Sequence, residues 1–181
     1  MTSKLKTDIL ETVSGSGTIA LTNQLSGMTS ASVPSGSVVQ VVYKNNEGST
    51  NTYFQSTSDT FVTLPNLSTT ITPTSTSSKV ILHFHGAGFF RGSATNLRLR
   101  LLRGSTVVWY ADRFMYTESG GTWGNANITN SFVDAPSTTS EITYSLQVAV
   151  SGGTNLAFRI GDNSASNNDT MSSMQLIEFK G

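Results

Sequence analysis

The two histidines of this chain have the spacing that most directly suggests chemistry. His83 and His85 flank Phe84 in an alternating apolar segment, residues 79–86. Successive side chains of a β-strand point to opposite faces, so we expect both imidazoles on one face and Phe84 on the other. In a trimer, three such pairs near the axis would offer enough imidazole nitrogens for a metal ion. No carboxylate is close to the pair in the sequence, which favours the simpler interpretation of two histidines on a half-buried polar face.

The acidic and serine residues do not form a recognisable catalytic set. The carboxylates considered as catalytic candidates are dispersed: Asp112, Glu118, Asp134, Glu141, Asp162, Asp169 and Glu178. None of them pairs as a glycosidase dyad would require, and no Gly-x-Ser-x-Gly nucleophile turn is present. Residues 161–170 offer oxygen ligands for calcium but lack the alternating acidic spacing of a calcium loop. We therefore predict a protein that is not an enzyme and that needs no cofactor or metal.

A glycine-rich segment, residues 117–125, carries the most suggestive aromatic residue. Trp123 stands among glycines, and an aromatic ring exposed at a loop tip can serve as a platform for a sugar ring. The alternative is that Trp123 folds back and closes the end of the sandwich. With the second polar loop, residues 161–170, the segment gives four candidate receptor contacts: Trp123, Asn125, Asp162 and Asn167.

The apolar residues lie in short alternating segments that predict β-strands. The clearest segments are residues 38–43, 79–85, 97–102, 142–150 and 174–179. After residues 97–102, Arg103-Gly104-Ser105 indicates a tight hairpin to residues 106–110. The other predicted strands are residues 52–55, 60–63, 67–71, 111–116, 128–133 and 156–160. They are rich in β-branched and aromatic residues and are separated by Gly, Asn and Ser, and no helical periodicity competes with them. The sequence therefore predicts an all-β protein, a jelly-roll β-sandwich of about ten antiparallel strands. In the 142–150 segment the alternation predicts an inner face that runs from Ile142 to Val150, and Trp109 is predicted to be core.

The first 37 residues differ from the rest and predict a separate arm. Two short segments, residues 4–10 and 18–22, precede a low-complexity linker at residues 26–36. Two short strands cannot bury a face alone, so the arm is expected to be extended and to dock on a partner; the alternative is a disordered tail. We predict residues 1–37 to be an N-terminal mounting arm and linker, and residues 38–181 to be the jelly-roll head.

The composition excludes several classes of protein. A net charge of zero and 12% charged residues argue against nucleic-acid binding, and the absence of cysteine excludes a disulfide framework. No apolar stretch is long enough to insert into a membrane, and the N-terminus lacks the apolar region of a signal peptide. A composition rich in threonine and poor in charge suits an exposed β module. Synthesis in a cytoplasm combined with such a surface is typical of a virion protein that is released by lysis.

Two sets of residues resemble known families. Residues 3–19, Ser-Lys-Leu-Lys-Thr-Asp-Ile-Leu at their start, resemble the opening of many tailed-phage fibre and virion structural proteins, especially those of cyanophages. The strand order of the remainder is similar to that of the trimeric jelly rolls of the complement-globular-head and tumour-necrosis-factor group, which also cap phage fibres. The segments that carry this second resemblance are residues 77–86, 97–103, 142–150 and 174–179.

The resemblance implies a homotrimer with a structural or adhesive role and no active site. It makes the chain a tail-fibre or receptor-binding head mounted on the virion by its arm. The alternative is a capsid decoration or cement protein, or a head fibre, that stabilises the shell; a carbohydrate-binding module is a remoter alternative. The implied partners are other virion proteins, of the tail and baseplate or the major capsid protein, and a host cell-surface glycan.

Overall fold

The computed structural model describes residues 33–46, 59–91, 95–117, 123–151 and 172–181. The strands in these residues are β1 (Val38–Asn46), β2 (Val62–Ile71), β3 (Lys79–Arg91), β4 (Thr95–Arg103), β5 (Thr106–Thr117), β6 (Trp123–Asp134), β7 (Ile142–Ser151) and β8 (Ser172–Phe179). No helix in the described part of the chain is long and apolar enough to cross a membrane.

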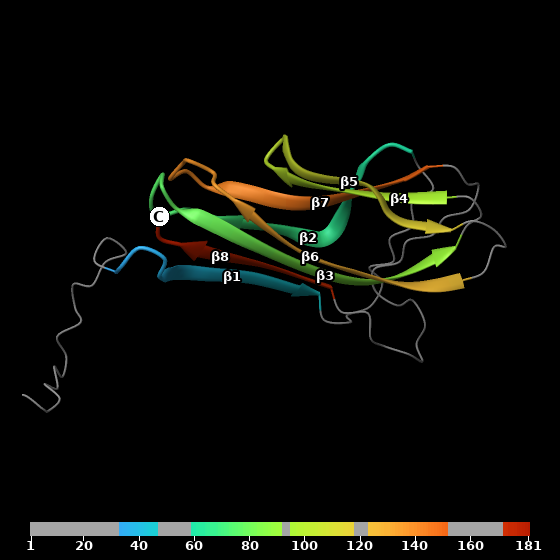
Figure 1. Ribbon diagram of the computed structural model, residues 1–181, viewed down its shortest axis with the longest axis horizontal. Helices are drawn as coiled ribbons and strands as arrows, with labels where there is room; N and C mark the ends of the chain where they lie inside the picture. Colours follow the sequence, from blue (N-terminus) through green and yellow to red (C-terminus); the bar gives the residue numbers. More distant parts are fainter. Residues whose placement is uncertain (1–32, 47–58, 92–94, 118–122, 152–171) are drawn as a thin grey trace, which may run out of the picture. The chain divides into compact units, whose positions relative to one another are not determined.

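The strands form two four-stranded sheets in which neighbouring strands run antiparallel (Figure 1). The first sheet has the order β1-β8-β3-β6 and the second the order β2-β7-β4-β5. In both sheets, strands far apart in the sequence are neighbours. Eight strands in this order, arranged as two Greek keys, are a jelly roll. The predicted all-β jelly-roll sandwich is therefore confirmed.

The hydrophobic core lies between the two sheets and follows the period-two alternation of the strands. Its buried members are Leu64, Leu67, Ile71, Val80, Leu82, Phe84, Leu97, Leu99, Leu101, Ile128, Tyr144, Leu146, Val148, Val150, Met174 and Leu176. Ile142 and Trp109 pack against this cluster while partly exposed. The predicted inner face of β7 and the predicted core position of Trp109 are therefore confirmed.

Several predicted strands are joined or displaced. The predicted segments 60–63 and 67–71 belong to one strand, β2, whose pairing with β7 shifts register between Thr63 and Ser68. Residues 106–116 likewise belong to one strand, β5, with two irregularities in its pairing with β4. A β-bulge interrupts the alternation without ending the strand, which explains why each strand was predicted as two. Two further predicted strands, residues 52–55 and 156–160, lie outside the described residues.

A buried carboxylate joins the two sheets at one end of the sandwich. Asp134, the last residue of β6, is 9% exposed, and Arg103 of β4 approaches both of its carboxylate oxygens, at 3.0 and 2.9 Å. The hydroxyl of Tyr144 on β7 donates a hydrogen bond to Oδ2 of Asp134 at 2.6 Å. Burial raises the pKa of the Tyr144 hydroxyl, and the hydrogen bond to Asp134 raises it further. The first sheet thus supplies the acceptor, and the second sheet both donors.

A second buried carboxylate fixes the edge of the first sheet. Glu178 of β8 is fully buried and accepts hydrogen bonds from Gln40 Nε2 and from the backbone N–H and hydroxyl of Thr74, the latter two at 2.7 and 2.8 Å. Burial raises the pKa of Glu178, but the neighbouring Ser78 hydroxyl, Gln40 and Thr74 lower it by more, so the net shift is downward. Glu178 is therefore held as a carboxylate that connects β1 to the segment between β2 and β3.

The chain divides into two compact units, Met1–Val33 and Pro34–Gly181. At the start of the second unit, the Gly36 N–H donates to the carbonyl of Lys180 at 2.7 Å, and the Lys180 N–H donates to the carbonyl of Ser37 at 2.9 Å. Gly36 has a φ of 83°, a conformation that favours glycine. The arm itself lies almost wholly outside the described residues, so the domain boundary between residues 37 and 38 stays a prediction.

Candidate functional site

The two ends of the sandwich differ in what they carry (Figure 1). Gly36 and Ser37 bond to Lys180 at the end where β1 begins and β8 finishes. At the opposite end, the pairs Arg91 with Trp123 and Thr95 with Thr117 close the ladders of β3, β6, β4 and β5. The strand ends that bracket residues 118–122 and 152–171 lie at this second end as well, because Asn96 pairs with Ser151. The arm end and the loop end of the sandwich are therefore opposite.

The structure corrects the predicted recognition loop, residues 117–125. Thr117 is the last residue of β5, and Trp123 and Asn125 are in β6, paired with Arg91 and Phe89 of β3. The loop prediction rests on the glycines of this segment; the long partner strand β3 extends the ladder through Gly124, while residues 118–122 lie outside the described residues. Asp162 and Asn167, with the segment considered for calcium, lie outside the described residues. The structure thus places two of the four candidates on the β6 backbone at the loop end, and receptor contact stays a prediction.

The histidines lie as the alternation predicts. His83 is exposed and His85 half-buried on the outer face of β3, whereas Phe84 is 2% exposed within the core. The His83 Nδ1 atom lies 2.6 Å from the hydroxyl of Ser131 on β6. Among the described residues, no group of three or more His, Cys, Asp or Glu side chains could hold a metal ion. Within one chain, the pair therefore lies in a polar part of the outer face of this sheet.

An apolar row crosses the outer face of the first sheet. Val41 of β1 pairs with Ile177 of β8, Ile177 with Ile81 of β3, and Ile81 with Val133 of β6. We call these four residues the outer apolar row. Val41 is 48% exposed and Val133 55%, while the two isoleucines between them are half-buried. A band of β-branched side chains thus faces outward across all four strands.

This row is not among the features predicted from the sequence, although a signal for it is present. The outward positions of three alternating segments carry apolar residues, at Val41, Ile81 and Ile177, beside the inward ones. Strands that are apolar on both faces indicate a sheet that is covered on both sides.

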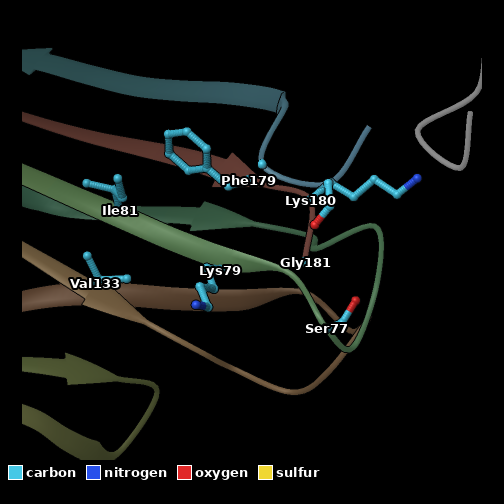
Figure 2. A pocket seen from close by; sticks show the side chains of 9 residues that line it. Ser77, Lys79, Ile81, Val133, Phe179, Lys180 and Gly181 are labelled. Carbon is cyan, nitrogen blue, oxygen red and sulfur yellow. The ribbon is translucent and has the colours of Figure 1, made fainter. Parts of the chain in front are cut away.

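A shallow hollow adjoins the row at the arm end of the sheet (Figure 2). It has a volume of about 590 Å³, and its lining residues are Ser35, Gly36, Ser77, Lys79, Ile81, Val133, Phe179, Lys180 and Gly181. Ile81 and Val133 are shared with the outer apolar row. Figure 2 shows both side chains together with Phe179 and Lys79 from β8 and β3. The hollow therefore continues the apolar face up to the point where the second unit begins.

The outer face of the second sheet has a different character, with arginine and aromatic side chains. The guanidinium carbons of Arg98 and Arg100 lie 5.4 and 4.2 Å from the ring centre of Phe61, and Tyr110 meets Phe61 edge-on at 6.0 Å. Arg98 forms an ion pair with Asp59. Cation–π contacts of this kind stabilise a surface by about 0.5–1 kcal/mol where exposed. The cluster therefore covers and rigidifies this face.

Polar side chains fix two members of that cluster. Arg100 Nε donates to Oε1 of Gln147 at 2.7 Å. The hydroxyl of Tyr110 donates to Asp112 at 2.7 Å, and this hydrogen bond is the main cause that raises the pKa of Tyr110. Arg98 is already paired with Asp59, and Arg100 with Gln147. This face is therefore less suited to binding a partner than the outer apolar row.

Comparisons with known proteins give a partial likeness to viral particle structures. No protein-family model matches the chain, and no curated protein matches it. Among solved structures, the VP2 subviral particle of infectious bursal disease virus is 13% identical, with a TM-score of 0.43 and coverage of 80% of this chain and 34% of that chain. The structure of the Gt strain of the same virus is 13% identical, with a TM-score of 0.40 and coverage of 79% and 41%. This chain therefore spans less than half the length of either of these two chains.

Proposed function

We propose that this protein is a non-enzymatic structural component of a tailed-phage virion. In this proposal it is a trimeric tail-fibre or receptor-binding head, and residues 1–37 mount it on the particle. Its partners are its trimer mates, a tail or baseplate protein at the arm, and a glycan on the host surface. It takes no cofactor, binds no nucleic acid and does not insert into a membrane.

The observation that carries the proposal is that the two ends of the sandwich differ. The second unit begins at Gly36 and Ser37, which are hydrogen-bonded to Lys180 at one end. The strand ends that bracket residues 118–122 and 152–171 lie at the other end. A rigid β-sandwich that is held at one end presents the connections at its other end, where binding residues are commonly placed. Jelly rolls also serve as viral capsid and lectin domains, so the analogy of fold points the same way.

A capsid decoration or cement protein, or a head fibre, is the second candidate. The observation that favours it is the outer apolar row, because a subunit that braces a shell needs a side face that packs against its neighbours. The two candidates differ in the surface that makes the functional contact: a receptor-binding head binds through its loop end, and a decoration protein binds through its faces.

Trp123→Ala in an infectious phage that carries this gene separates the two candidates. For a receptor-binding head we expect normal particle assembly and lost adsorption, because a sugar ring stacked on one indole contributes weakly alone and strongly when three heads engage together. Tyr110→Ala is the matched control, since Tyr110 is a 48% exposed aromatic residue on the second sheet. If Trp123→Ala phage adsorb normally but their particles break at lower temperature, the result would contradict the receptor-binding head and support a decoration protein on the capsid surface.

A deletion tests the mounting role of the arm. For this test we choose a cut before Pro34, because Gly36 and Ser37 bond to the end of β8. We expect the chain without residues 1–33 to keep its melting temperature and to be missing from particles. A truncated chain that aggregates would show that the arm belongs to the folding unit.

A further inference from the structure

The hollow at the arm end of the first sheet has an uncovered apolar floor. Ile81 of β3 pairs with Val133 of β6, and two residues earlier in β3 Lys79 pairs with Phe179 of β8 (Figure 2). Val133 is 55% exposed, and Ile81 and Phe179 are half-buried. Apolar side chains that meet in a concave site gain free energy when a ligand covers them. The floor therefore favours an occupant with apolar side chains.

Small residues complete the lining and leave room above this floor. They are Ser35, Gly36, Ser77 and Gly181. A Cβ atom at Gly36 would meet no other atom within 4 Å. The volume of about 590 Å³ falls within the range of ligand sites, roughly 300–1,000 Å³. This room suits a few side chains of an extended segment.

The charged side chains of the lining favour an acidic occupant. Among the residues that line the hollow, Lys79 and Lys180 are charged, and no Asp or Glu is present. Lys79 is exposed, and no described residue forms an ion pair with it, whereas Figure 2 shows the ammonium group of Lys180 directed away from the apolar side chains. Glu178 and Asp134 are buried on the opposite face of their strands. A carboxylate in the hollow would therefore meet Lys79 and no acidic side chain.

The hollow also lies where the second unit begins. Ser35 and Gly36 line it, and the Gly36 N–H is held by the carbonyl of Lys180. In the proposed function a virion protein holds residues 1–37, so that protein is tethered within a few residues of the hollow. Two contacts joined by a short stretch of chain bind far more tightly together than either does alone. The protein that holds the arm is therefore the favoured occupant.

We infer that the hollow binds an extended segment of the protein on which the arm is mounted, and that this segment combines apolar side chains with at least one carboxylate. The apolar side chains cover Ile81, Val133 and Phe179, and the carboxylate pairs with Lys79. The inference rests on the proposed function and adds a second contact to the mounting, in the sandwich itself. The apolar contact supplies most of the affinity, and the exposed ion pair selects an acidic segment over a basic one.

Release of the chain from purified particles tests this contact. Each variant is the sole copy in an infectious phage that carries the gene, and the chain lost after dilution is followed by quantitative mass spectrometry. Val133→Glu should raise the rate constant of release by about 30-fold, the effect of losing a central contact residue. Val133→Lys should raise it by a smaller factor, because its carbon stem still covers the floor and its charge attracts an acidic segment.

Val107→Glu is the control for release, on a 44% exposed valine of the other sheet, and should leave particles at the rate of the parent. Thermal melts of the purified chains check that each variant folds. Equal release of Val133→Glu and the parent, or of Val133→Glu and Val133→Lys, would overturn the inference. A parent that is absent from particles would overturn the proposed function.

Cross-linking from position 133 keeps the inference testable if a variant does not assemble. The photoreactive residue p-benzoylphenylalanine replaces Val133, or Val107 as the control, in infected cells, and illumination links it to the protein that lies against it. We expect a product with a tail, baseplate or capsid protein from position 133 alone, through a segment that contains Asp or Glu. No product, a basic segment or a link to a second copy of this chain would overturn the inference. An acidic segment of a protein outside the particle would support the site and overturn the proposed function instead.

Discussion

Replacing Tyr144 by phenylalanine removes one hydroxyl from the cluster that joins the two sheets. That hydroxyl is buried and donates to Oδ2 of Asp134 at 2.6 Å. A hydrogen bond to a charged group contributes about 1.5–3 kcal/mol. In the variant, Arg103 still contacts both carboxylate oxygens, so Asp134 stays paired. We therefore expect the free energy of unfolding to fall by about 2 kcal/mol, the contribution of the one lost hydrogen bond. For a chain of this length the melting temperature should fall by about 4–8 °C.

Asp134→Ala is expected to cost more, because it leaves two donors without an acceptor. The Tyr144 hydroxyl stays buried and unpaired, while the Arg103 side chain, 28% exposed, recovers part of its hydration. We expect a loss of about 3–4 kcal/mol. In the double variant with Tyr144→Phe the losses should not add, and the coupling should be about 1–2 kcal/mol. Urea unfolding followed by tryptophan fluorescence measures all three free energies.

The same cluster predicts how stability changes in alkali. The pKa of Tyr144 is raised above its ordinary value of 10.0, so the stabilisation is complete below that pH and is lost as the pH rises above it. The slope from one such proton is at most about 1.4 kcal/mol per pH unit. Tyr144→Phe should lack this component. If the variant unfolds at the same urea concentration as the parent, or shows the same alkaline slope, the proposed link between the sheets is wrong.

Three further substitutions test other parts of the account. Glu178→Gln should make stability depend less on pH in acid. The lowered pKa of Glu178 gives stabilisation that is present above about pH 4.5 and is lost as the pH falls through the lowered pKa. Thermal melts between neutral pH and pH 3 measure this dependence, and an unchanged dependence in the variant contradicts it. Leu146→Ala, at a fully buried core position, should lower the free energy of unfolding by about 3 kcal/mol in urea titrations. Gly104→Ala should destabilise the β4–β5 hairpin by about 1 kcal/mol, since Gly104 has a φ of 58°, and no loss of stability would show that the turn relaxes.

Alternation along single strands made the fold largely predictable from the sequence. In residues 142–150 each second side chain is apolar, and those side chains form the inner face of β7. Gly104, in the predicted hairpin between residues 97–102 and 106–110, has the positive φ that a tight turn requires. Where bulges interrupt the alternation, as in β2 and β5, one strand was predicted as two, because a bulge looks like a break in a local pattern.

The surfaces could not be predicted in the same way, because they are made by register between distant strands. Val41, Ile81, Val133 and Ile177 become one row only in the jelly-roll order β1-β8-β3-β6. A shift of one residue in any strand would turn its member of the row inward. Trp123 illustrates the same limit: its glycine neighbours predict a loop, whereas pairing with Arg91 makes it the first residue of β6.

The measurement that tests the virion role most directly is the number of copies of this chain in purified particles. Infectious particles carrying the gene are banded twice on density gradients, and the chain is counted by quantitative mass spectrometry against the major capsid protein. We expect the chain to remain with infectivity through both gradients at a constant number per particle, divisible by three. A chain that is recovered in the soluble part of the lysate and is missing from the particle band would contradict the account.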